Sequence, residues 1–230
     1  MKIRVTYKKR GMIKYISHLD TMRLFHRTFR RMEIPILFSQ GFNPHMLMSL
    51  ANPLALGVES DIEFMDFETD YNGDLNTLMG TFNKGLPNGI EAYQIEEAGD
   101  ISVNEIVKWS VYEFDFLNDY GLGKEEIEDK VSDILRTEEI IIEKRAKKKG
   151  KKTLVKRNVR DFIKDIEVSN LSGDSVILQA ILRSSSTGGL NPIEFTKILQ
   201  SFIEISKDVD TVNILRIDQH DEEGSSLKAT

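Results

Sequence analysis

The sequence contains no cysteine, and this absence removes several classes of chemistry at once. Without thiols the chain has no disulfide, no thiolate metal site and no cysteine nucleophile. A cysteine-free chain also fits a reducing compartment. We therefore expect a cytoplasmic protein that folds through its hydrophobic core alone, because 230 residues are enough to bury one without covalent staples.

Long apolar runs and the common nucleotide or hydrolase motifs are missing as well. No apolar run approaches the roughly 18 residues of a membrane span, and the first ten residues, MKIRVTYKKR, lack the apolar stretch of a signal peptide. The sequence has no G-x-x-x-x-G-K-[ST], no G-x-G-x-x-G after a strand, no H-E-x-x-H and no G-x-S-x-G. We expect no membrane contact, no cofactor and no metal site.

Positive charge is unevenly distributed along a chain whose net charge is −6. Residues 1–47 hold ten Lys and Arg against two acids, a local charge of +8, and residues 144–160 hold ten more without one acid, or +10. The remainder must then carry −24. Local charge of this kind identifies candidate interaction surfaces that the whole-chain value hides.

The order of predicted elements in residues 1–100 is that of a ferredoxin-like (split βαβ) domain. Strands are predicted at 3–7, 36–38, 46–51, 63–68 and 90–95, and helices at 17–33 and 74–83. In the first helix Ser17 is the expected N-cap, with Asp20 in a capping-box position. One apolar stripe is expected to be buried, consisting of Leu19, Met22, Phe25, Phe29 and Met32.

Residues 101–220 repeat the pattern and predict a second ferredoxin-like half. Strands are expected at 107–116, 140–142, 176–182 and 212–217, and helices at 124–136 and from Pro192. The predicted fold class is therefore α+β, with mainly antiparallel sheets in two halves that meet near residues 98–104. The tail 221–230 is polar and expected to be loose.

The first basic segment combines a loop and one face of the first helix. Its cations, with Phe42 as an aromatic that could stack a base, make a candidate nucleic-acid surface. The candidate residues are Lys8, Lys9, Arg10, Lys14, Arg23, Arg27, Arg30, Arg31 and Phe42. The alternative is that a helix needs a solvated face and uses arginine for it.

The second basic segment is predicted to be a hairpin with Gly150 at its turn. Its loop would contact a phosphate backbone without sequence preference, and the alternative is a solvated tip that discourages edge-to-edge aggregation. The candidate residues are Lys147, Lys148, Lys149, Lys151 and Lys152.

Histidines supply the only candidate acid–base groups with an ordinary pKa near neutrality. His18 and His45, together with Asp20, are the candidates for catalysis, and both histidines could face one pocket. The alternative for each histidine is a capping or partly buried polar residue.

Three segments resemble the bacterial radical SAM-associated protein family, an uncharacterised domain found beside or fused to cobalamin-type radical SAM proteins. They are residues 15–20 (YISHLD), 38–45 (FSQGFNPH) and 53–60 (PLALGVES). The motif positions in these segments are Ser17, His18, Asp20, Ser39, Gln40, Gly41, Phe42, Asn43, Pro44, His45, Gly57, Glu59 and Ser60. The resemblance implies a radical SAM partner, whereas the chain has no C-x-x-x-C-x-x-C motif and is not itself a radical SAM enzyme.

Three functions remain open from the sequence. The first is a non-catalytic RNA-binding accessory module that works with a radical SAM partner in RNA modification or processing. The second is a metal-independent RNA-processing enzyme that uses His18 and His45, an idea that rests on analogy of fold. The third is a protein-interaction subunit that docks its partner through the basic faces.

Overall fold

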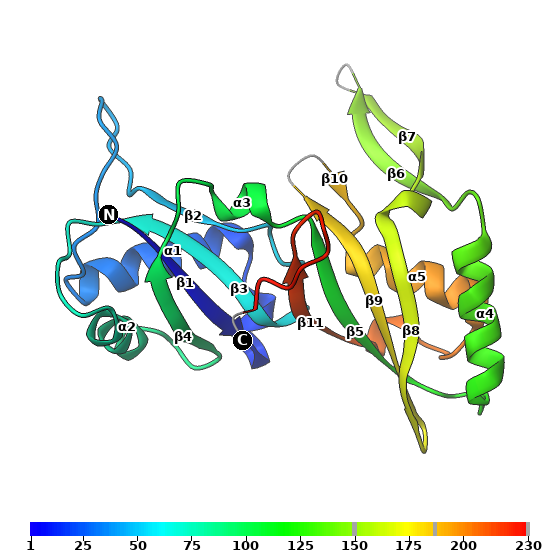
Figure 1. Cartoon of the computed structure of the whole chain (residues 1–230). Coiled ribbons are helices and arrows are strands. Elements are labelled where there is room, and N and C mark those ends of the chain that lie inside the picture. Colours follow the sequence, from blue (N-terminus) through cyan, green and yellow to red (C-terminus); the bar gives the residue numbers. More distant parts are fainter. Residues whose placement is uncertain (149–150, 186–187, 229–230) are drawn as a thin grey trace. The chain divides into compact units, whose positions relative to one another are not determined.

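Strand β1 (Lys2–Lys9) is the centre of an antiparallel sheet in the first unit of the chain. The computed structural model describes residues 1–148, 151–185 and 188–228 (Figure 1). β1 pairs with β3 (Glu59–Glu68) on one side and with β4 (Ile90–Glu97) on the other, and β2 (Met48–Leu50) adds to β3. The resulting order, β2-β3-β1-β4, is that of the split βαβ fold, as predicted.

Helices cover one face of this sheet. Helix α1 (His18–Arg31) follows a 3₁₀ turn, η1 (Gly11–Tyr15), and α2 (Leu75–Lys84) connects β3 to β4. The rings of Phe25 and Phe29 are buried against the sheet, where Phe25 lies 5.2 Å from Tyr7 and Phe29 lies 4.9 Å from Phe67, measured between ring centroids. This aromatic cluster fixes the height and rotation of α1 over the strands.

The second unit contains the other predicted half. Its elements are β5 (Trp109–Leu117), α4 (Lys124–Arg136), β6 (Ile141–Lys148), β7 (Lys151–Asn158), η2 (Arg160–Phe162), β8 (Ile163–Ser172), β9 (Ser175–Ser185), β10 (Gly188–Gly189), α5 (Pro192–Ile203) and η3 (Val209–Thr211). Strands are ordered β8-β9-β5, with β10 added to β9 and a separate two-stranded β6–β7 hairpin. The α+β class with mainly antiparallel sheets is confirmed.

The division between the units differs from the predicted one at 98–104. The first unit takes residues 1–110 and 214–230, and the second takes 111–213. The short helix α3 (Val103–Ile106) and most of the last strand, β11 (Asn213–His220), thus belong to the first unit. β11 pairs in parallel with the start of β3, where Leu215 lies opposite Glu59 and Arg216 opposite Ser60.

Residues 221–228 of the tail are held against the first unit. The amide of Leu227 donates to the carbonyl of Gln219 at 2.8 Å, and His220 forms an isolated bridge with Ser226. Leu227 also packs against the small apolar cluster that contains Ile62 and Val103. The chain therefore turns back on β11 instead of leaving the surface at residue 221.

Two predicted details were wrong, and strands β8 and β10 were not predicted. Residues 36–38 form no strand, only an isolated bridge between Phe38 and Met46. Leu19 is 65% exposed because helical side chains lean toward the N-terminus, so its side chain projects from the first turn of α1. Strand β8 was not predicted because register shifts after Ile163 and Val168 interrupt the alternation of apolar residues.

Candidate functional site

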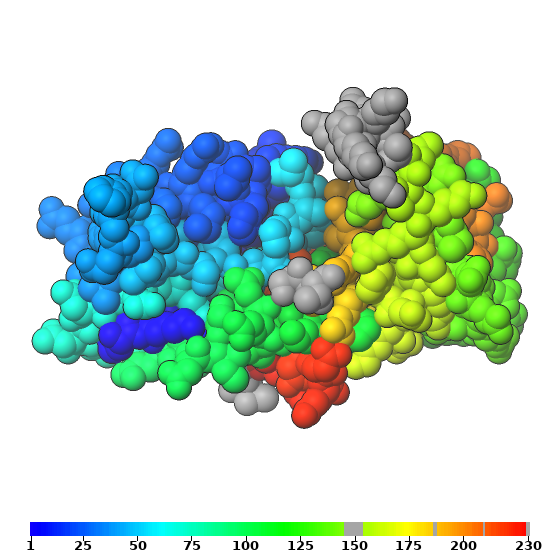
Figure 2. Space-filling model, turned by 90° about the horizontal axis from the view of Figure 1, so that it is seen from above, coloured from blue at the N-terminus to red at the C-terminus, as the bar shows by residue number. Residues whose placement is uncertain are grey.

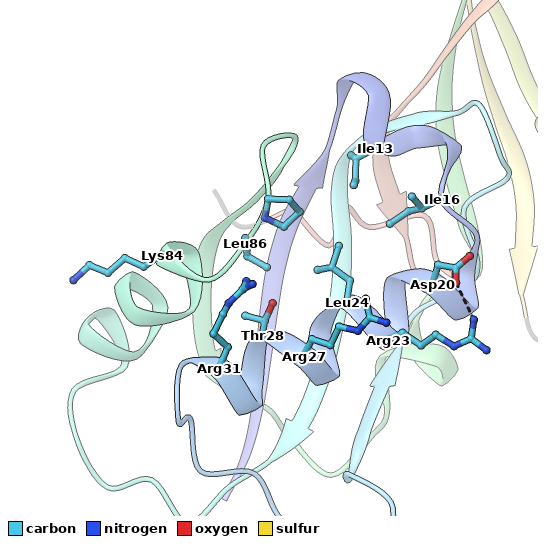
Figure 3. Close-up of a pocket in the computed structure, with 11 residues that line it drawn as sticks. Ile13, Ile16, Asp20, Arg23, Leu24, Arg27, Thr28, Arg31, Lys84 and Leu86 are labelled. Atoms are coloured by element: carbon cyan, nitrogen blue, oxygen red, sulfur yellow. Dashed lines mark hydrogen bonds and ion pairs between the residues drawn. The ribbon is translucent and has the colours of Figure 1, made fainter.

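A groove of about 710 Å³ runs along the exposed side of α1 in the first unit (Figure 3). Its walls come from α1, from η1 and the residue after it, and from the turn between α2 and β4. The lining residues are Ile13, Ile16, Asp20, Arg23, Leu24, Arg27, Thr28, Arg31, Lys84, Leu86 and Pro87. We call this feature the α1 groove. Its volume is within the range of small-ligand pockets.

The N-terminal end of α1 is held by its own side chains. Ser17 is the N-cap, and its Oγ accepts a hydrogen bond from the amide of Asp20 at 3.1 Å. The Ser17 hydroxyl in turn donates to Oδ2 of Asp20 at 2.7 Å, while Oδ1 of Asp20 accepts from Arg23 at 2.9 Å. These bonds confirm the predicted cap, and they lower the pKa of Asp20, chiefly through the Ser17 hydroxyl.

The C-terminal end of α1 is tied to the end of α2 through the carbonyl of Gly85. Thr28 Oγ1 donates to that carbonyl at 3.2 Å, and the Arg31 guanidinium donates to it as well. A Cβ on Gly85 would lie 2.5 Å from Met32 and 2.9 Å from Thr28, so only glycine permits this approach of the two helices. The groove is therefore closed at this end by backbone.

The third wall is fixed by the turn before β4. The amide of Arg10 donates to the carbonyl of Gly89 at 2.7 Å, which joins the start of η1 to this turn. Gly89 has a φ of +93°, a conformation that favours glycine. This link brings Ile13 next to Leu86 and Pro87 across the groove.

Cations and apolar side chains occupy different parts of the groove. Figure 3 shows Arg27 and Arg31 along α1, with Leu24 pointing from the helix toward Ile13, Arg23 turned toward Asp20 and Lys84 pointing outward. In the part of the chain that the structure describes, Arg27, Arg30 and Arg31 form no ion pair with a carboxylate, and all three are exposed. The groove thus offers charged donors beside an apolar floor.

Two predicted binding residues are used inside the first unit instead. Arg10 pairs with Asp61 at 2.6 Å and with Glu59 at 3.4 Å, and these partners raise the pKa of Arg10. Lys9 is 3% exposed, and its Nζ donates to the carbonyl of Ile16 at 3.1 Å. Burial lowers the pKa of Lys9. Neither side chain is available to a ligand in the groove.

Lys8, Lys14 and Phe42 also lie outside the groove lining. Lys8 lies over the ring of Tyr93 of β4, at 5.5 Å, and Lys14 Nζ is 3.9 Å from Glu59. Phe42 is completely exposed in the loop between α1 and β2. That loop projects from the first unit (Figure 1), and its light-blue atoms lie on the face seen in Figure 2.

The two candidate catalytic histidines are in different pockets. His18 lines a small polar pocket with Tyr7, Lys9 and Glu63. His45 lines another, beside Lys2 and Asp66, and its Nδ1 is 2.7 Å from Oγ of Ser39. The structure thus places His18 and His45 on the walls of two different pockets.

The remaining residues of the resembling segments are mostly structural. Ser39, Gln40, Gly41, Asn43 and Pro44 belong to the loop closed by the Ser39–His45 bonds. Gly57 has a φ of +82° and its amide donates to the carbonyl of Lys14. Ser60 is buried and its Oγ donates to the carbonyl of Ile62.

The β6–β7 hairpin confirms the predicted strands of the second basic segment. Lys147 lies opposite Lys152 and Lys148 opposite Lys151. Lys149 and the expected turn residue Gly150 lie outside the described residues.

Sequence reasoning missed Lys84, Leu86 and Pro87, which line the groove from another element. The only available signal was a cation, Lys84, directly after the predicted helix 74–83 and before a predicted turn. Among the described residues, no group of three or more His, Asp or Glu side chains could hold a metal ion, and no helix is long and apolar enough to cross a membrane.

Comparison with known proteins places the chain in a family. A family model described as "Uncharacterized protein conserved in bacteria (DUF2344)" matches residues 2–192. The chain belongs to this family. A search of curated proteins found no match.

Among solved structures, a chain in "Crystal Structure of a Cbf5-Nop10-Gar1 Complex" is similar over 95% of the present chain, with 11% identity and a TM-score of 0.44. The present chain spans 50% of the length of that protein. A likeness at this level supports no argument about function.

Proposed function

We propose that this member of the family is a non-catalytic RNA-binding module that holds RNA phosphates in the α1 groove. The observation that carries the proposal is the row Arg23, Arg27 and Arg31, spaced four residues apart on one helix and exposed to solvent. Residues four apart rise about 6 Å along a helix, so their side chains form a continuous row. Guanidinium groups match phosphate oxygens in a bidentate geometry.

The groove arginines are better able to bind a phosphate than the other cations of the first basic segment. Lys9 and Arg10 are held by groups of the first unit, whereas Arg27 and Arg31 meet no carboxylate among the described residues. An incoming phosphate therefore gains their attraction without displacing an acid. The net charge of the whole chain is −6 and opposes RNA, which makes the local row of arginines decisive.

The β6–β7 hairpin supplies the second element of the proposal. Residues 144–158 of this hairpin carry nine cations and no acid, and such an excess costs stability through self-repulsion. We assign it as an electrostatic arm that contacts RNA backbone without sequence preference.

The partner is proposed from the resemblance of the segments around His18, His45 and Gly57. It implies a radical SAM protein that acts on the bound RNA in modification or processing. The enzyme alternative lacks support from geometry, since His18 and His45 line separate pockets.

Binding of total cellular RNA to the whole chain, measured by filter retention over a salt series, tests the proposal. Arg27→Glu should weaken retention at least about tenfold, because it removes one phosphate contact and adds a repulsive charge. Arg30→Glu is the matched control, since Arg30 is exposed on the same helix and makes the same charge change outside the groove lining. Equal losses in the two variants would contradict the groove, and absence of retention at low salt would end the proposal.

The protein-interaction alternative predicts a different result. If the groove docks an acidic face of a protein, co-purification with the radical SAM partner should survive nuclease and be lost in Arg27→Glu. RNA retention by the isolated chain would then be the same in both variants.

A further inference from the structure

The floor of the α1 groove is apolar, a feature that phosphate binding alone does not require. Ile13 and Ile16 lie on one side, Leu24 in the middle, and Leu86 and Pro87 on the other. All five are partly exposed. Surface apolar groups that line a concave site beside a row of cations commonly contact the apolar part of a ligand.

Among the forms of RNA, only an unpaired nucleotide presents a ring face and a phosphate to the same short groove. In a duplex the bases are stacked inside, and the outer surface consists of phosphate and sugar. A duplex docked on Arg27 and Arg31 would leave Leu24 and Leu86 in water. A splayed base could cover them and remove their apolar surface from solvent.

We infer that the α1 groove binds a single-stranded RNA segment, with a base against Leu24, Leu86 and Pro87 and its flanking phosphates on Arg27 and Arg31. This inference rests on the proposed function and adds to it the form of RNA that is bound. The volume of about 710 Å³ accommodates a nucleotide with its neighbouring phosphate.

The polar groups of the groove make the recognition tolerant of sequence. Thr28 Oγ1 already donates to Gly85, and the carboxylate of Asp20 accepts bonds from Ser17 and Arg23. Few groups therefore remain to read the hydrogen-bonding edge of a base. Contact through ring faces and phosphates is shared by all four nucleotides.

The test uses a fluorescein-labelled 12-nucleotide RNA, free of internal pairing, and the same strand annealed to its complement. Binding to the full chain is followed by anisotropy at fixed salt. The single strand should bind roughly tenfold more tightly than the duplex, because only the single strand covers the apolar floor of the groove. Leu24→Asn should abolish this preference while leaving duplex binding unchanged.

Leu19→Asn is the matched control, because Leu19 is an exposed leucine of the same helix outside the groove. Leu86→Asn approaches the site from another element and replaces Leu24→Asn if that variant does not fold by circular dichroism. Equal binding of single strand and duplex, or equal behaviour of the Leu19 and groove variants, overturns the inference but leaves the proposed function. Failure of both RNAs to bind overturns the proposed function itself.

Discussion

Arg216 of β11 donates a hydrogen bond to Glu63 of β3 at 2.7 Å, and both side chains are buried. Lys9 lies in the same cluster and Tyr7 is buried beside it, with a pKa raised first by burial and then by Glu63. Two buried cations therefore share one buried acid. This cluster fastens the last strand to the sheet that supports α1.

Removal of Glu63 should be among the most destabilising single changes in the first unit. Glu63→Gln removes the negative charge that Arg216 and Lys9 both face, and breaking a buried pair in this way costs about 3–5 kcal/mol. The expected result is a large fall in the urea midpoint of unfolding, followed by circular dichroism.

The double variant Glu63→Gln/Arg216→Met distinguishes a charge effect from a packing effect. If uncompensated charge is the cause, the double change should cost less than the sum of the single changes. Glu128→Gln is the control, because Glu128 forms an exposed pair with Lys124 on α4 and should leave the midpoint unchanged. Additive single changes would show that Glu63 acts through shape alone.

His18 should make stability depend on pH. Burial is the main cause of its lowered pKa, with Lys9 lowering it further and Glu63 opposing. The unfolded chain binds the proton more readily than the folded one, so the stabilising contribution is complete above about pH 6.5 and is lost as pH falls through the lower folded-state pKa. His18→Gln should therefore reduce the loss of urea stability between pH 7.5 and 5.5.

Exposed His45 offers the control for this prediction. His45→Gln should leave the difference between the two pH values as in the wild type. If His18→Gln also leaves it unchanged, His18 does not carry the effect, and His26, whose pKa burial also lowers, becomes the remaining histidine of α1 to test.

Local sequence signals were sufficient where an element is defined by its own residues. Ser17 and Asp20 mark the start of α1, acids lead α4, and Pro192 begins α5, as their capping and charge preferences require. Strand β8 was not predicted because two bulges interrupt its alternation of apolar and polar residues. The position of β11 beside β3 was not predicted because strand pairing depends on tertiary contacts and not on local sequence.

The candidate site was predictable only in part for a related reason. Helical spacing put Arg27 and Arg31 on an exposed face, and the structure agrees. Helical spacing could not show that Arg10 pairs with Asp61, fifty-one residues away, or that Lys9 is buried. Leu86 lines the groove only because Gly85 lets α2 approach α1, a contact with no local signature.

Gly89 should be intolerant of a side chain. Its φ is +93°, and a Cβ would lie 2.3 Å from the carbonyl oxygen of Arg10, which is backbone and cannot turn aside. Gly89→Ala should therefore lower the free energy of unfolding by roughly 1–3 kcal/mol and loosen the groove wall at Ile13. Urea unfolding measures the first effect, and RNA affinity measures the second.

The paired change Gly80→Ala should act in the opposite direction. Gly80 is exposed inside α2, and a Cβ there would meet nothing within 4 Å. Alanine favours a helix interior over glycine by about 0.5–1 kcal/mol, so the variant should be slightly more stable. Equal tolerance at both positions would show that the turn at Gly89 relaxes without strain.

Asp20 should restrain RNA binding, because its Oδ1 holds Arg23 at 2.9 Å at one end of the groove. Asp20→Asn removes the charge but keeps an oxygen that can accept from the Ser17 hydroxyl, so the cap survives. Arg23 then becomes available to a phosphate, and affinity for single-stranded RNA should rise a few-fold. The slope of log K against log salt should steepen by roughly 0.7, the value for one further phosphate on a single strand.

A double-mutant cycle decides whether Asp20→Asn raises RNA affinity by releasing Arg23. In an Arg23→Gln background, Asp20→Asn should give a much smaller gain, since no guanidinium remains to be released. The same gain in both backgrounds would mean that Asp20 acts by general repulsion of RNA. A loss of affinity in Asp20→Asn would show instead that the Asp20 contact holds Arg23 in its binding position. It would contradict the prediction that Asp20 restrains RNA binding.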